Sequence, residues 1–158
     1  MKQRSYDFKS TWLVSVPAEA VEAVLLNLET WTSWWPGLES ASVVKPVDEV
    51  VGSIITCTWR SPAGYRLHMR MMITEYVPGR YIRFKSVGDL EGQGSWSFIS
   101  PDGASTRMDI IWQVSTTRPW MNASGPILRP LFVYSHNLLM RRGNKGLQAY
   151  LLQQDLEP

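Results

Sequence analysis

PLFVYSHNLLMRRGNKGLQAYLLQ, residues 130–153, has the pattern of one long amphipathic helix. At 3.6 residues per turn, one face of this helix collects mostly apolar or small side chains. The residues on this face are Leu128, Phe132, His136, Leu139, Met140, Gly143, Gly146, Leu147 and Tyr150. A helix of this length is roughly 35 Å long, enough to cross a small domain. The sequence therefore predicts a broad apolar surface elsewhere in the chain that covers this face.

A second pattern, alternation with a period of two, predicts seven β-strands. They are expected at residues 6–16, 38–45, 53–60, 65–77, 81–87, 92–100 and 106–116. Short turn signals, such as PGR at 78–80 and PDGA at 101–104, predict that the last six strands form an antiparallel meander. After the first strand we expect a short helix over 18–29, with Ser15 as its cap, and a second helical turn over 30–35. Three prolines in 119–130 argue against a regular helix there, so Pro130 either begins the long helix, which we favour, or kinks it.

The alternation also predicts the two faces of the sheet. Residues expected on the apolar face are Leu67, Met69, Met71, Ile73, Ile82, Phe84, Trp96, Phe98, Met108, Ile110, Trp112 and Val114. Arg66, His68, Arg70, Arg83 and Lys85 are expected on the other face, where a solvated surface explains them more simply than an RNA site. The apolar face is then the surface that receives the long helix.

Length and composition limit the classes of protein. A chain of 158 residues is the size of one domain, so we expect a single domain over 1–158. The net charge of +2 is too small to indicate nucleic-acid binding. The one cysteine, Cys57, allows no internal disulfide and fits a reducing compartment, so we expect a cytoplasmic protein. No window approaches 18 apolar residues, which argues against membrane insertion.

Several short runs, taken in their order and spacing, resemble one known superfamily. They are Val16, Pro17 and Val21 at the first corner, WTSWWPG at 31–37, GQGSW at 92–96, TTRPWM at 116–121, and His136, Met140, Gly143, Gly146 and Leu147 in the last helix. The chain resembles the START-like (SRPBCC, Bet v 1-like) superfamily, in particular its polyketide cyclase/dehydrase-like branch. The resemblance implies an α+β helix-grip fold, in which a curved seven-stranded antiparallel sheet wraps a long C-terminal helix and two short helices follow strand 1.

The same resemblance implies a hydrophobic cavity between the sheet and the long helix, used across the superfamily for lipids, sterols, hormones and aromatic polyketides. We expect no cofactor, and the branch has no universal catalytic motif that could be carried over to this chain. The residues expected to bind a ligand are Met69, Met71, Trp96, Met108, Trp112, Trp120, Phe132, His136, Met140 and Gly143. Aromatic surfaces and adaptable thioethers suit a flat or flexible hydrophobic ligand, although a closed core would use the same residue types.

Three features of this candidate site lead to specific expectations. Gly143 is expected to open space for the ligand, so that leucine at this position would abolish ligand uptake without unfolding the protein. The tryptophans at 31, 34, 35 and 120 lie in connections, where they either gate the cavity mouth or pack corners. His136 either anchors a ligand oxygen, donates a proton, or is a core histidine bonded to a backbone carbonyl. No convergent set of metal ligands is evident, and no metal site is expected.

These observations leave three functional hypotheses. The leading one is a protein that binds a hydrophobic small molecule, lipid-like or aromatic polyketide-like, in the cavity. The second is a cyclase or dehydratase type of enzyme that uses general acid/base chemistry in the same cavity, with His136 as the weak candidate for a catalytic residue. The third is a pocketless module that binds other proteins through a tryptophan-rich surface. The sequence leaves open whether the chain forms a homodimer.

Overall fold

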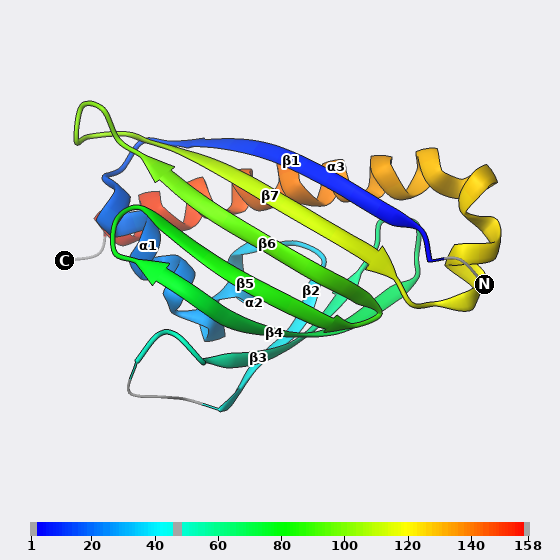
Figure 1. Ribbon diagram of the computed structural model, residues 1–158. Helices are drawn as coiled ribbons and strands as arrows, with labels where there is room; N and C mark the ends of the chain where they lie inside the picture. Colours follow the sequence, from blue (N-terminus) through cyan, green and yellow to red (C-terminus); the bar gives the residue numbers. More distant parts are fainter. Residues whose placement is uncertain (1–2, 46–48, 157–158) are drawn as a thin grey trace.

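The computed structural model describes residues 3–45 and 49–156. The elements in chain order are β1 (Ser5–Val14), α1 (Ala18–Leu26), the 3-10 turn η1 (Leu28–Thr30), α2 (Trp31–Trp34), β2 (Leu38–Lys45), β3 (Ile54–Arg60), β4 (Arg66–Val77), β5 (Tyr81–Gly88), β6 (Leu90–Ile99), β7 (Thr106–Thr116) and α3 (Pro119–Leu156). Helix α3 extends along one face of the curved sheet, and α1 and α2 lie near the C-terminal end of α3 (Figure 1). The predicted helix-grip architecture is confirmed.

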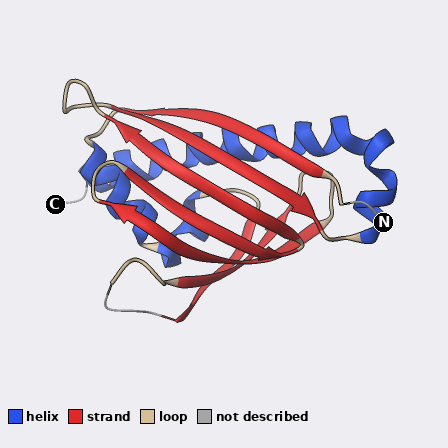
Figure 2. Ribbon diagram, viewed as in Figure 1, coloured by secondary structure: helices blue, strands red, loops and turns tan. Residues whose placement is uncertain are grey.

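All seven strands belong to one antiparallel sheet with the order β1-β7-β6-β5-β4-β3-β2 (Figure 2). Strands β2 to β7 form the predicted meander, each joined to the next by a short connection. Strand β1 pairs with β7, where Trp12 lies opposite Met108. Consecutive strands β1 and β2 therefore lie at opposite edges of the sheet, because α1, η1 and α2 carry the chain from one edge to the other.

The alternation predicted for the strands agrees with the observed burial. On β4, Met69 and Met71 are buried, whereas Arg70 between them is exposed. On β6, Trp96 and Phe98 are buried and Ile99 is exposed. The apolar face of the sheet is thus the face that receives α3, as the sequence predicted.

The basic residues of the outer face are partly neutralised by acidic neighbours. Arg66 forms an ion pair with Glu39, with 2.8 Å between Nε and Oε2, and Arg83 forms one with Glu75, with 2.9 Å between Nη1 and Oε2. These contacts favour the interpretation of this face as an ordinary solvated surface.

Helix α1 is fixed by a buried acidic residue. Ser15 does not cap the helix, because Pro17 occupies the position before Ala18, and no side chain among the described residues caps this end. Glu22 is instead 8% exposed and accepts hydrogen bonds from the Tyr76 hydroxyl, at 2.7 Å, and from the Gly79 backbone N–H, at 2.6 Å. These two bonds tie α1 to strand β4 and to the turn that follows it.

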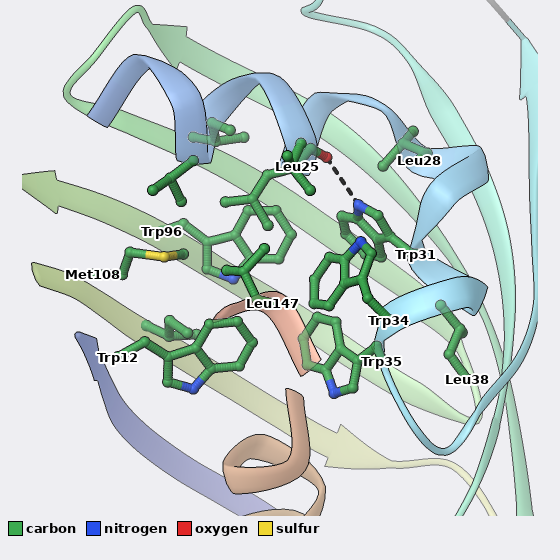
Figure 3. Close-up of a cluster of buried hydrophobic side chains, with 14 of the residues drawn as sticks. Trp12, Leu25, Leu28, Trp31, Trp34, Trp35, Leu38, Trp96, Met108 and Leu147 are labelled. Carbon is green, nitrogen blue, oxygen red and sulfur yellow. Dashed lines mark hydrogen bonds between the residues drawn. The ribbon is translucent and has the colours of Figure 1, made fainter. Parts of the chain in front are cut away.

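Most of the tryptophans form the centre of the core (Figure 3). The Trp31 indole N–H donates to the Leu25 carbonyl at 3.1 Å, the bond drawn in Figure 3, and the Trp34 ring stacks on Trp35 with centroids 5.3 Å apart. The Trp35 indole N–H donates to a carbonyl of α3, that of Leu139, at 3.1 Å. Trp31, Trp34 and Trp35 are all buried, which supports corner packing for this run, and the alternative role as a gate at the cavity mouth stays a prediction.

Helix α3 begins at Pro119, eleven residues before the predicted start, and both Pro126 and Pro130 lie inside it. The expected start at Pro130 is wrong, and long-range contacts from Arg4 support the helix where Pro126 interrupts its hydrogen bonds. Proline at 126 leaves the Asn122 carbonyl without its helical partner, and the Arg4 side-chain Nε donates to this oxygen at 3.4 Å. The Asn122 side chain accepts from the Arg4 backbone N–H at 2.8 Å and donates to the Thr116 carbonyl at 3.0 Å. The first turns of α3 run at an angle to the rest of the helix (Figure 1).

Two glycines let α3 approach α2 very closely. A Cβ atom at Gly146 would lie 1.7 Å from the Trp34 carbonyl oxygen, and one at Gly143 would lie 2.5 Å from the Trp35 indole nitrogen. Tight packing of the helix against tryptophan, rather than free space, therefore explains why small residues occur on the buried stripe. The expectation that Gly143 opens space for a ligand is wrong.

Candidate functional site

A cavity of about 140 Å³ lies between the apolar face of the sheet and α3. Its walls are formed by β1, strands β3 to β7, the β3–β4 connection and α3, together with α2 and the residue that follows it, Trp35. The lining residues are Tyr6, Phe8, Trp31, Trp35, Trp59, Ser61, Pro62, Tyr65, Leu67, Met69, Met71, Phe84, Leu90, Trp96, Ile110, Trp112, Met121, Phe132, Ser135, His136, Leu139 and Met140. Among the described residues, no Asp, Glu, Lys or Arg lines the cavity. Its walls are therefore mainly aromatic and aliphatic, with a few neutral polar groups.

Most of the ligand-binding residues predicted from the sequence line this cavity. The structure brings together Met69, Met71, Trp96, Trp112, Phe132, His136 and Met140. Their positions follow from the predicted alternation on β4, β6 and β7 and from the helical stripe of α3. Whether these side chains contact a ligand stays a prediction.

The other predicted residues lie outside the lining. Met108 is fully buried in the closed part of the core, on the same strand as Trp112. Trp120 is 40% exposed and packs edge-on against Tyr65 and Phe132, with ring centroids 5.4 and 5.9 Å apart, so these two rings separate it from the cavity. Gly143 faces the Trp35 ring, as described above.

Sequence reasoning missed several lining residues that carry polar atoms. Tyr6 and Trp12 lie an even number of positions apart on β1, so both side chains point inward. The alternation alone could therefore have identified Tyr6 as a lining residue. Tyr65 lies just before β4, on the same side as Met69. Ser135 lies three residues after Phe132 and four before Leu139, so the helical spacing could have placed it on the buried face of α3, but its polar hydroxyl kept it out of the apolar pattern.

His136 lies against the N-terminal half of β1. Its ring stacks on Phe8, with centroids 3.7 Å apart and 14° between the planes. Its Nδ1 atom is buried and has no hydrogen-bond partner among the described residues. Burial lowers the pKa of His136 from 6.5 to about 4, and a weaker interaction with Asn137 acts in the opposite direction. The imidazole is therefore neutral at neutral pH, when it offers one donor and one acceptor nitrogen.

Two hydroxyls near His136 are also buried without a partner among the described residues, those of Tyr6 and Ser135. Tyr6 is 4% exposed and Ser135 is 3% exposed. Burial raises the pKa of Tyr6 and also that of Tyr65. The polar groups of the cavity are thus uncharged at neutral pH.

The structure also bears on two other kinds of site. In residues 3–45 and 49–156, no three His, Cys, Asp or Glu side chains come together in a way that could hold a metal ion. Across these ranges, no helix is both long and apolar enough to cross a membrane.

Residues 6–152 match the model of the family described as polyketide cyclase/dehydrase and lipid transport. The chain belongs to this family. The resemblance to the polyketide cyclase/dehydrase-like branch is confirmed by this match, and the structural neighbours below share the fold. No curated protein matches the sequence.

Many solved structures share the fold of this family member. The TTHA0849 protein of Thermus thermophilus is 22% identical with a TM-score of 0.77, over 94% of this chain and 99% of its own. The Zhui aromatase/cyclase of Streptomyces sp. R1128 is 13% identical with a TM-score of 0.75, over 96% of each chain. A START superfamily protein of Mycobacterium smegmatis is 14% identical with a TM-score of 0.76, over 94% of this chain and 98% of its own. At such identities the likeness shows the fold alone.

Proposed function

We propose that this protein binds a hydrophobic small molecule in the cavity between the sheet and α3. The observation that carries the proposal is the composition of the walls, where aromatic rings and methionines surround a space with no charged side chain among the described residues. Such a surface gains free energy when it is covered by an apolar ligand, and methionine side chains adapt to the ligand's shape. The description of the family, which includes lipid transport, supports the same class of function.

The cyclase or dehydratase alternative has less support from the cavity. General acid catalysis by His136 would need the imidazolium form, but burial lowers the pKa of this residue to about 4. At neutral pH only about 0.1% of the side chain is then protonated. The support for this alternative is that one structural neighbour, 13% identical to this chain, is an aromatase/cyclase. The pocketless interaction module is disfavoured by the cavity itself.

Native mass spectrometry of the purified protein tests the proposal directly, since a retained apolar compound would appear as an added mass. A designed variant then locates the binding site. Leu67→Trp adds bulk to a lining residue on β4 and should abolish retention, because the added ring occupies the cavity.

The matched control is Val87→Trp, which adds the same bulk to a side chain that is 54% exposed on β5. It should retain the compound as the unaltered protein does. If Leu67→Trp, shown to be folded by circular dichroism, binds the compound as tightly as Val87→Trp does, the ligand does not occupy this cavity and the proposal fails.

A further inference from the structure

The cavity has a polar end and an apolar end. Tyr6 near the start of β1 and Tyr65 before β4 flank the same ring, Phe132 of α3, with centroids 6.4 and 5.7 Å from it. Ser135 and His136 follow Phe132 by about one helical turn, so these polar side chains gather on one part of the lining. Further along the strands, the walls consist of apolar side chains, namely Met71, Phe84, Trp96, Ile110 and Trp31.

Three polar atoms at this end are buried and lack a hydrogen-bond partner among the described residues: the Tyr6 hydroxyl, the Ser135 hydroxyl and His136 Nδ1. Buried polar atoms in folded proteins almost always have partners, so three orphaned atoms on one cavity wall need an explanation. A purely apolar ligand would exclude water from these atoms and leave them unpaired. A ligand that carries an oxygen here would satisfy them instead.

The composition of the cavity lining also indicates that this ligand oxygen is uncharged. No Lys or Arg among the described residues lines the cavity. Arg129 lies over the Tyr6 ring, with its guanidinium carbon 4.4 Å from the ring centroid, but it donates to the Ser5 carbonyl at 3.1 Å and is not part of the cavity lining. Burying a carboxylate without a cation is strongly unfavourable, whereas a hydroxyl or carbonyl needs only the neutral partners that are present.

We propose that the cavity selects uncharged ligands that combine a flat apolar body with a hydroxyl or carbonyl oxygen, which the Tyr6, Ser135 and His136 end receives, and that it rejects carboxylates such as fatty acids. This inference rests on the proposed function, because it names the ligand chemistry of the same cavity. Tyr6 and Ser135 can each donate to the ligand oxygen, and His136 can donate or accept according to its tautomer.

Three probes of similar shape separate these chemistries: naphthalene, 2-naphthol and 2-naphthoate at neutral pH. Isothermal titration calorimetry should give a Kd for 2-naphthol about 5-fold lower than that for naphthalene, as expected for one net hydrogen bond. The Kd for 2-naphthoate should be at least about 10-fold higher than that for 2-naphthol, because the carboxylate loses its water without gaining a cation.

A double variant, Tyr6→Phe with Ser135→Ala, assigns the preference to the polar end. It should reduce the advantage of 2-naphthol over naphthalene to less than about 2-fold and leave naphthalene binding in place. Since both deleted hydroxyls lack partners among the described residues, the melting temperature should not fall. The matched control is Tyr76→Phe, which removes a hydroxyl that donates to Glu22 and lies outside the cavity lining. This variant should keep the full preference.

The outcomes distinguish the two proposals. Suppose that naphthalene and 2-naphthol bind the natural sequence equally well and that neither binds Leu67→Trp. The preference for an oxygen is then refuted, while the cavity remains a binding site. Tightest binding by 2-naphthoate would overturn the preference for uncharged ligands. If none of the probes binds and the purified protein retains no apolar compound, the proposed function fails, and the present inference fails with it.

Discussion

Replacing His136 with phenylalanine should remove a defined part of the protein's acid sensitivity. Burial holds the pKa of His136 at about 4 in the folded protein, against 6.5 for the unperturbed side chain. As the pH falls below 6.5, the unfolded chain takes up the proton first, so the stability that this residue contributes is present above that value and is lost as the pH falls toward about 4. Between about pH 7.5 and about pH 4.5, this loss amounts to about 2.5 kcal/mol.

The measurement is the free energy of unfolding in urea at a series of pH values, for the natural sequence and for His136→Phe. The phenyl ring retains the stack on Phe8 but cannot ionise. The difference in stability between the two proteins should therefore shift by about 2.5 kcal/mol over this range, in favour of the variant at low pH. The control is His68→Gln, at an exposed position on the outer face, which leaves His136 in place and so keeps its contribution. A parallel pH dependence in the natural sequence and His136→Phe would refute the burial argument, as would an NMR titration of His136 near its ordinary pKa.

Two further predictions concern packing and thiol reactivity. Gly146→Ala should destabilise the protein by about 2 kcal/mol in urea unfolding, because the added Cβ meets the Trp34 carbonyl. Gly125→Ala, also in α3, meets only the Arg4 side chain, at 3.0 Å or more, and should cost clearly less than Gly146→Ala; equal effects of the two changes would contradict the packing described. Burial raises the pKa of Cys57 to about 12, so iodoacetamide at about pH 8 should label this thiol only after unfolding, as followed by mass spectrometry, and rapid labelling of the folded protein would show that the strand is accessible.

The strands could be predicted from sequence because each is specified locally. Alternation between inward and outward side chains is set by the pleat of a single strand, and glycine or proline at the turns marks its ends. Gly79 and Gly103, for example, have the positive φ angles that such turns require. The start of α3 was not predictable in this way. The bonds that accommodate Pro126 come from Arg4 and Asn122, which lie 118 residues apart in the sequence.

The candidate site was predictable only as a face, not as a cavity. Met108 and Trp112 lie on the same side of β7, yet only Trp112 lines the cavity. The difference depends on where the aromatic rings of β1 and α2 fill the space beneath the sheet, as Trp12 and Trp35 do. Periodicity gives the direction of a side chain but not the volume left over once every other side chain is in place.

The pairing of the first strand with the last has a consequence for how the chain folds. Ser5 pairs with Ser115 and Val14 with Thr106, so β1 has no strand partner until more than ninety further residues have been synthesised. Contacts so distant in sequence slow folding, because a large loop must close before they form. The hairpins from β2 to β7 are local and can form earlier. Closure of the sheet by β1, which also brings Tyr6 and Phe8 to the cavity, is therefore expected to be a late and rate-limiting event in folding.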